Sequence, residues 1–204
     1  MTREKGHILP DVLAPGLRIV FCGSAAGHKS ARIGAYYAGP GNKFWPTLHR
    51  VGFTPRLIAP PDYRAVLELG IGLTDLCKTG FGNDVELDPA HDDVAGLLRK
   101  IRRYRPRVLA FTAKRPAAVV LRALGAGKKP PAYGLQDATI GATRLFVLTS
   151  PSGRAGAFWD EQVWQELVRL AESPSPSRER RSCIQDGVSA NGRATTWCSS
   201  SKTI

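Results

Sequence analysis

The chain has few cysteines, few acidic residues and no long hydrophobic run, and each shortage excludes a class of protein. Its four cysteines, Cys22, Cys77, Cys183 and Cys198, form no Cys-x-x-Cys pair, so we expect no zinc site, iron–sulfur cluster or disulfide framework. No stretch reaches the roughly 18 apolar residues that cross a bilayer. Residues 1–10 lack the apolar segment of a secretion signal, which predicts a protein of the cytoplasm or the nucleoid.

Acidic residues are outnumbered by basic ones. The 17 Asp and Glu residues stand against 29 Lys and Arg residues, which gives a net charge of +12 and an isoelectric point near 10.0. Such a balance favours a polyanionic partner, and nucleic acid is the commonest. A charge that serves only solubility is the alternative.

Apolar runs of strand length predict a buried parallel sheet. Three of them, Leu17–Cys22, Val108–Thr112 and Leu145–Thr149, are each followed by small or polar residues. Continuous apolar strands are typical of a sheet that is covered on both faces. Gly70–Leu76 is either a fourth strand or a loop that enters the site.

Helical periodicity fills the segments between these strands, and alternation of the two kinds of element predicts a three-layer α/β/α sandwich with a central, mostly parallel sheet. The predicted helices cover Asn42–Val51, Asp62–Leu69, Val94–Tyr104, Pro116–Leu124 and Trp159–Leu170. A Ser/Pro-rich stretch and an Arg cluster then replace the apolar pattern. We therefore expect one domain over residues 1–171 and a disordered tail over residues 172–204.

Two loops of small residues follow predicted strands. Gly23–Ala31 comes after the first strand, and Thr149–Gly156 comes after the last of the three. Because ligands bind at the carboxyl ends of parallel strands, we expect both loops at one edge of the sheet, where small residues let a flat ligand approach the backbone. The first loop is also compatible with phosphate binding, although it has neither the GxGxxG nor the P-loop spacing. The second is also compatible with an ordinary strand-to-helix connection.

Aromatic residues concentrate in a third segment, Tyr36–Trp45. Phe44 and Trp45 have the helical spacing of core residues, whereas Tyr37 is a candidate for stacking on a base. Stacking of this kind contributes about 1–3 kcal/mol per base.

Five segments, in this order along the chain, resemble the mismatch-specific uracil-DNA glycosylases, the branch that includes the thymine-DNA glycosylases. The resemblance extends from about Asp11 to Leu170. It rests on D-V-L-A-P-G-L-R-I-V-F-C, on G-S-A-A-G-H-K-S-A against the family's G-I-N-P-G-x-x-S-A, on A-G-P-G-N-K-F-W, on G-I-G-L-T-D-L, and on S-P-S-G against N-P-S-G.

The resemblance implies an enzyme that flips uracil, or thymine and related bases, out of DNA and hydrolyses the N-glycosidic bond as a monomer without metal or cofactor. Tyr37 would take the stacking position. The other base-binding positions would be Gly23, Ala25, Ala26, Gly27 and Ser30. The DNA-binding positions, which include the wedge loop, would be His28, Lys29, Lys43, Ser150, Ser152, Gly153 and Arg154.

Two departures from the family motifs affect the chemistry. Ala25 stands where the family has the asparagine that positions the hydrolytic water, and Ser150 replaces the asparagine of the second motif. An alanine side chain has no donor or acceptor with which to orient water. Asp75 and Asp84 are therefore the candidate catalytic acids, because a carboxylate orients water and stabilises a cationic sugar. His28 is a further candidate.

The predicted function is removal of uracil or a related deaminated or mismatched base at the start of base-excision repair. Two alternatives stay open: a protein that binds uracil or abasic DNA without turnover, which Ala25 favours, and a nucleotide-processing enzyme that uses the Gly23–Gly27 loop. Basic residues beside the crevice, Lys114, Arg115, Lys128 and Lys129 among them, are predicted to contact phosphates.

Overall fold

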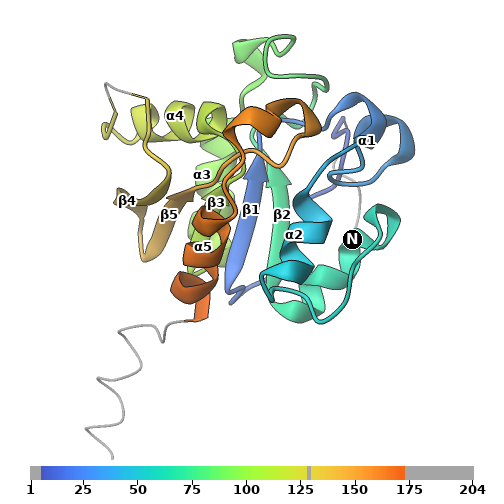
Figure 1. Cartoon of the computed structure of the whole chain (residues 1–204). Helices are drawn as coiled ribbons and strands as arrows, with labels where there is room; N and C mark the ends of the chain where they lie inside the picture. Colours follow the sequence, from blue (N-terminus) through green and yellow to red (C-terminus); the bar gives the residue numbers. More distant parts are fainter. Residues whose placement is uncertain (1–5, 128–129, 173–204) are drawn as a thin grey trace, which may run out of the picture. The chain divides into compact units, whose positions relative to one another are not determined.

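A five-stranded sheet lies at the centre of the computed structural model, which describes residues 6–127 and 130–172 (Figure 1). The strand order is β2-β1-β3-β5-β4. β2 (Ile71–Asp75), β1 (Ile19–Gly23), β3 (Val108–Phe111) and β5 (Thr143–Val147) are parallel, whereas β4 (Gly134–Ile140) runs antiparallel to β5. The sheet is therefore mostly parallel, and four strands end at the same edge.

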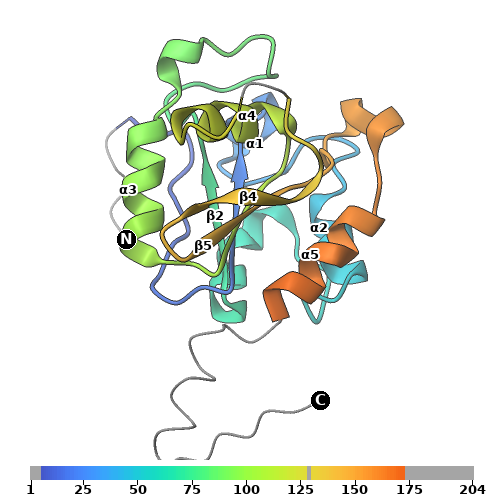
Figure 2. The same cartoon turned by 90° about the vertical axis from the view of Figure 1, so that its left-hand side faces the viewer.

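The three apolar runs form β1, β3 and β5, as predicted, and Gly70–Leu76 contains the strand β2. β1, β2 and β3 are buried throughout. β4 was not predicted, because only its two end residues are buried and the residues between them include the polar Gln136 and Asp137. Figure 2 shows β4 beside β5 at the end of the sheet, where one face of a strand tolerates polar side chains.

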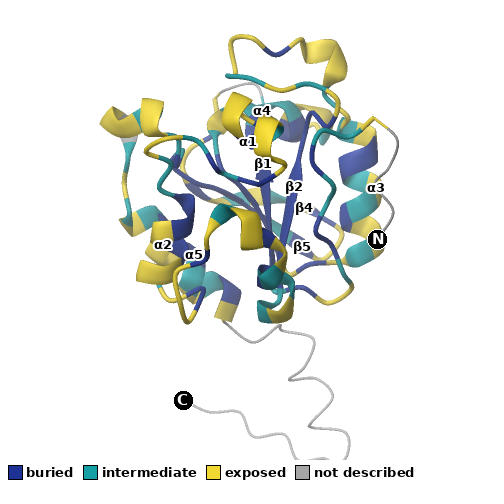
Figure 3. Cartoon of the chain, turned by 90° about the vertical axis from the view of Figure 1, so that its right-hand side faces the viewer, coloured by how far each residue is buried: buried dark blue, intermediate teal, exposed yellow. Residues whose placement is uncertain are grey.

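Helices pack on both faces of the sheet. One face is covered by α2 (Phe44–Arg50), the 3-10 helix η1 (Pro60–Leu69) and α5 (Gln162–Glu172), and the other by α3 (Val94–Tyr104) and α4 (Lys114–Ala123). Buried strands separate helices whose outer faces are exposed (Figure 3). The predicted α/β/α arrangement is confirmed.

The helix predictions agree with the structure to within a few residues. α3 matches at both ends, and its start is fixed by the carboxylate of Asp93, which accepts a hydrogen bond from the Gly96 N–H at 2.7 Å. The short helices α1 (His28–Ile33), η2 (Pro89–His91) and η3 (Gly153–Phe158) were not predicted. They lie in loops and are too short to show helical periodicity.

The predicted boundary between domain and tail remains a prediction. α5 continues through Glu172, one residue past the predicted end of the domain, and residues 173–204 lie outside the described residues. Among residues 6–127 and 130–172, no helix is both long and apolar enough to cross a membrane.

Aromatic side chains join α2 and α5 to the sheet. The Phe21 ring on β1 stacks on Trp164 at 5.9 Å and meets Phe44 edge-on at 5.1 Å. The indole N–H of Trp164 also donates to the Oγ1 of Thr149 at 3.2 Å. Trp164 therefore fixes the chain where it leaves β5, just before the loop of Ser150–Ala155.

Replacing Trp164 with alanine should lower the free energy of unfolding by about 3–5 kcal/mol, because it removes a large, fully buried ring and a buried hydrogen bond. Urea denaturation would measure the loss. The control is Leu57→Ala, since the Leu57 side chain is 56% exposed and should change stability by no more than about 0.5 kcal/mol. Equal effects of the two substitutions would contradict this description of the core.

Candidate active site

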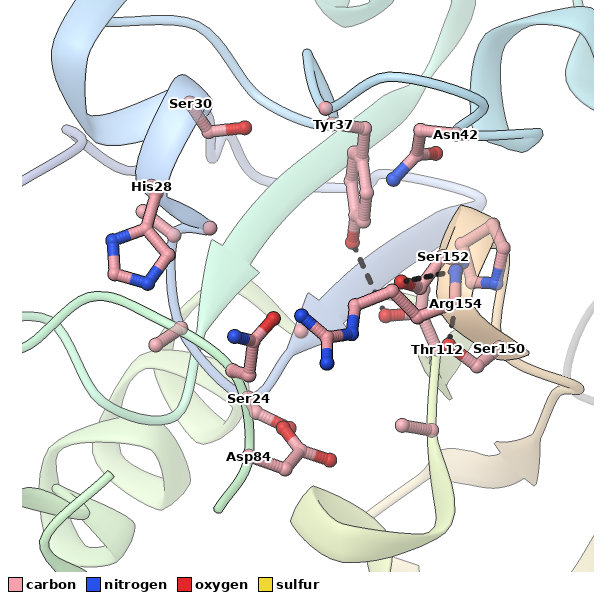
Figure 4. A pocket seen from close by; sticks show the side chains of 18 of the residues that line it. Ser24, His28, Ser30, Tyr37, Asn42, Asp84, Thr112, Ser150, Ser152 and Arg154 are labelled. Atoms are coloured by element: carbon pink, nitrogen blue, oxygen red, sulfur yellow. Dashed lines mark hydrogen bonds between the residues drawn. The ribbon is translucent and has the colours of Figure 1, made fainter. Parts of the chain in front are cut away.

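A cleft of about 640 Å³ opens at the carboxyl ends of β1, β2, β3 and β5. In an open parallel sheet, ligands bind in the crevice at this edge. Figure 4 shows side chains from several loops converging on it. Of the two candidate acids and the residues carried over from the family motifs, the cleft contains all except Lys43. Its wall is formed by residues from the segments 23–30, 36–42, 82–85 and 150–155, together with Asp75, Thr112 and Ala113.

The carboxylate of Asp75 lies at the cleft and against Gly23. Asp75 is the last residue of β2 and pairs in register with Gly23, the last residue of β1. A Cβ atom on Gly23 would lie 2.6 Å from the Asp75 Oδ1, closer than real Cβ contacts allow. The absence of a side chain at Gly23 therefore leaves the space that the Asp75 carboxylate occupies.

Burial gives Asp75 an unusual pKa. The residue is 5% exposed, and desolvation raises the pKa of its carboxyl from 3.8 to about 6. The positive charge of Lys78 and a hydrogen bond from Tyr36 lower this pKa, whereas the negative charge of Asp11 raises it. The carboxyl of Asp75 therefore changes charge closer to neutral pH than an exposed aspartate does. A pKa near the working pH is typical of an efficient general base.

Tyr37 forms another wall of the cleft. Its ring stacks on Phe44 with a centroid distance of 3.7 Å and an interplanar angle of 14°. Its hydroxyl lies 3.4 Å from the Thr112 Oγ1, and the two are joined in Figure 4. The backbone of Tyr37 has a φ of 53°, a left-handed conformation that costs a non-glycine residue roughly 1–2 kcal/mol. The stacked ring thus holds a strained backbone conformation in place.

The loop after β5 is organised by its own serines. The Ser150 Oγ accepts a hydrogen bond from the Ser152 N–H at 3.3 Å, and the Ser152 Oγ accepts one from the Arg154 N–H at 3.4 Å. A Cβ on Gly153 would lie 2.8 Å from the Pro40 carbonyl oxygen, so glycine allows this loop to approach the Tyr37 loop. The Arg154 side chain extends into the cleft (Figure 4).

Comparisons with known proteins identify the family. The model of the uracil DNA glycosylase superfamily matches residues 10–168. This chain belongs to the uracil DNA glycosylase superfamily. It is also similar to a candidate uracil DNA glycosylase from Methanosarcina acetivorans solved by solution NMR, with 25% identity and a TM-score of 0.55 over 81% of this chain and 97% of that one. Both comparisons support DNA glycosylase activity and DNA as the substrate.

The main departure from the motifs of the mismatch-specific branch, which this chain resembles, is Ala25 in the wall of the cleft. Ala25 lines the cleft between Ser24 and Ala26, and it presents only a methyl group there. Of the two candidate acids, Asp84 is exposed on the rim, whereas Asp75 is buried at the cleft. Asp75 is therefore the carboxylate whose surroundings depart most from water.

Three more of the predicted base- and DNA-binding residues also have partners within the protein. The buried Ser30 Oγ accepts a hydrogen bond from the Ala38 N–H at 3.0 Å and so holds the Tyr37 loop. The exposed His28 lies 2.9 Å from the Glu86 carboxylate. The Lys43 ammonium lies 5.0 Å from the Trp159 ring centroid, and Lys43 does not line the cleft.

The predicted phosphate contacts outside the cleft are placed differently. Arg115 forms an ion pair with Asp92 at 3.0 Å, and the Lys114 ammonium lies 4.3 Å from the Tyr133 ring centroid. Lys128 and Lys129 lie outside the described residues. Within residues 6–127 and 130–172, no three His, Cys, Asp or Glu side chains are grouped to hold a metal ion.

Several cleft residues were not predicted from the sequence. Tyr36 and Thr112 carry hydroxyl groups, and Asn42 and Asn83 carry amides. Thr112 ends a predicted strand and so had a signal in the sequence. The carboxamide oxygen of Asn42 accepts a hydrogen bond from the Phe44 N–H at 2.9 Å. An asparagine at the start of a helix has this structural role, so no pattern in the sequence placed Asn42 in the site.

The raised pKa of Asp75 predicts a change in stability. The protonated carboxyl is favoured in the folded state, so ionisation destabilises the fold as pH rises from 3.8 through about 6. Asp75→Asn mimics the protonated form and should unfold at a higher denaturant concentration than the wild type at pH 8, by up to about 3 kcal/mol. The difference should disappear near pH 4. A variant that is less stable than the wild type at pH 8 would contradict the raised pKa.

Proposed function

We propose that this member of the superfamily hydrolyses the N-glycosidic bond of uracil, or of a related deaminated or mismatched base, in DNA, and that Asp75 activates the water. The observation that carries the proposal is the Asp75 carboxylate, which is buried at the cleft beside Gly23. Its position supplies the acceptor that Ala25 lacks.

In the proposed reaction a water molecule bound by the ionised Asp75 attacks the C1′ atom of the deoxyribose. The C1′–N bond breaks with its electron pair remaining on the base, and the proton of the water passes to the carboxylate. The negative charge of Asp75 stabilises the cationic sugar that forms as the base leaves. At neutral pH a carboxyl with a pKa of about 6 is ionised, as this role requires.

Aromatic and backbone groups of the cleft suit a flat base. The Tyr37 ring, supported by Phe44, offers a stacking surface, and the backbone of Ala25–Gly27 forms the adjacent wall. An enzyme that acts on a paired base must rotate it out of the helix and fill the gap. The exposed Arg154, on the loop after β5, is proposed to fill it.

Charge supports binding of the DNA backbone. The chain carries a net charge of +12, and the basic residues Lys29 and Arg154 line the cleft. Phosphate contacts of this kind position the duplex without reading its sequence. We propose that the protein binds as a monomer and prefers mispaired bases, as the motifs of the mismatch-specific branch imply.

A second function, binding of uracil or abasic DNA without turnover, is favoured by Ala25. Ala25 lines the cleft and has no polar side chain with which to hold a water molecule. The two functions differ in one product, because only hydrolysis leaves an abasic site that alkali cleaves.

Excision of uracil from a U·G duplex under single-turnover conditions tests the proposal. Asp75→Ala should lower the rate by about 10²-fold or more, since it removes the acceptor for the proton of the water. Asp84→Ala is the matched control, because that carboxylate is exposed on the rim of the same cleft, and its loss should leave the rate within a few-fold of wild type.

The outcomes separate the alternatives. A wild-type rate in Asp75→Ala with a large loss in Asp84→Ala would move the catalytic role to the rim. Tight binding of the same duplex by the wild-type protein, with no abasic product, would establish the non-catalytic function.

The space at Gly23 gives a test that removes no functional group. Gly23→Ala should lower the excision rate by about 10²-fold, because the new methyl group displaces the Asp75 carboxylate and a shift of about 1 Å is enough for such a loss. Gly39→Ala is the control, since a Cβ on Gly39 meets no atom within 4 Å although this residue also lines the cleft. Equal rates for the two variants would exclude a role for the contact between Gly23 and Asp75.

A further inference from the structure

A buried network of charged groups lies behind Asp75. The Lys78 ammonium is 2.8 Å from the Asp11 carboxylate and 3.8 Å from that of Asp75, and its side chain is 3% exposed. It also donates a hydrogen bond to the Tyr36 hydroxyl at 3.0 Å. Because this hydroxyl accepts from Lys78, its own hydrogen is left to face Asp75, and as a donor the hydroxyl lowers the pKa of that carboxyl.

The fold places these groups together from distant parts of the chain. Val12 and Leu73 exchange two backbone hydrogen bonds of 2.9 Å, which set Asp11 beside the end of β2. The Thr74 hydroxyl donates to one Asp11 oxygen at 2.7 Å, and Lys100 on α3 is paired with the other at 2.6 Å. Asp11 is thus held from two sides and presents its carboxylate to Lys78.

The network extends further than a pair that serves stability alone. Burying a lysine is costly unless it is paired, and Asp11 already provides that pair. The additional contacts of Lys78 reach Tyr36 and the Asp75 carboxylate, which are both at the cleft. Asp11 and Lys78 do not line the cleft themselves, so they reach a bound base only through Asp75.

We propose that Lys78 is a positioning residue for base excision: with the Tyr36 hydroxyl it fixes the Asp75 carboxylate toward the water and keeps it ionised, and Asp11 holds Lys78 in place. The inference rests on the proposed function in that it takes Asp75 as the water-activating group. It assigns the pH range of the reaction in part to Lys78 and Asp11, which do not line the cleft.

Two members of the network act on Asp75 in opposite directions. Lys78 lowers the pKa of Asp75, and the Tyr36 hydrogen bond does so as well, whereas Asp11 raises it. The remaining titratable neighbours, Tyr37 and Cys22, have pKa values raised by burial and stay uncharged. Removing Lys78 and removing Asp11 therefore have effects of opposite sign, which a general loss of structure does not produce.

The experiment is the pH dependence of single-turnover excision in the wild type and in Lys78→Met, Tyr36→Phe and Asp11→Asn. The wild-type rate should rise with a midpoint near pH 6. Lys78→Met should move the midpoint upward by about one unit or more, since an opposite charge at this range shifts a pKa by about 1–3 units. Tyr36→Phe should move it upward by less, and Asp11→Asn should move it downward.

Lys100→Met is the matched control. It makes the same substitution and breaks an ion pair with the same Asp11, but Lys100 has no contact with Asp75. Its midpoint should stay within a few tenths of a unit of wild type. If Lys78→Met does not fold, Tyr36→Phe and Asp11→Asn carry the test through their opposite signs.

A titration of the Asp75 carboxyl carbon by NMR in the same intact variants gives a readout without DNA. Carboxyl midpoints that shift as described support the network. Midpoints equal in all variants would overturn it, and the proposed function would stand if Asp75→Ala still abolished excision. An unaltered rate in Asp75→Ala would overturn both the catalytic role of Asp75 and the positioning role of Lys78.

Discussion

The site depends on the burial of one carboxylate at the end of the sheet. Asp75 loses most of its contact with water because β1 and β2 pair closely and because Gly23 leaves room for the carboxylate between them. Desolvation raises the pKa of Asp75, and the positive charge of Lys78 lowers it. The balance leaves a group that is ionised at neutral pH and still has affinity for a proton, which an exposed aspartate lacks.

The same scaffold explains why the loops at this edge of the sheet form a defined cleft. Each wall is attached to the core by a contact that reaches deep into it: Tyr37 through its stack on Phe44, and the loop after β5 through Thr149 and Trp164. Gly153 lets these two walls approach one another. Strain at Tyr37 is retained because the packed aromatic residues around it do not allow another position.

Membership of the uracil DNA glycosylase superfamily, together with Ala25, gives this protein its particular interest. Under the proposed function, water activation has moved from the loop after β1 to the end of the neighbouring strand β2. The parallel register makes this exchange geometrically simple, because Gly23 and Asp75 lie side by side and both face the cleft. A change of catalytic group therefore requires no change of fold.

The sequence by itself determined the elements that repeat a local pattern. Continuous apolar runs located β1, β3 and β5, and an amphipathic period located α3 at both ends. The order of small-residue loops after strands predicted the edge of the sheet at which the cleft lies, and the resemblance to the glycosylase motifs named Asp75 and Asp84 as candidate acids. These features are readable because each depends on neighbours within a few residues of the chain.

Only the tertiary structure decided the surroundings of Asp75 and the edge of the sheet. The network of Asp11, Tyr36 and Lys78 joins residues up to 67 positions apart, and nothing in the local sequence of any one of them shows the others. β4 is stabilised by its pairing with β5, not by an apolar run of its own. Desolvation and long-range charge pairing are properties of the packed molecule, so the chemistry of the site had to come from the fold.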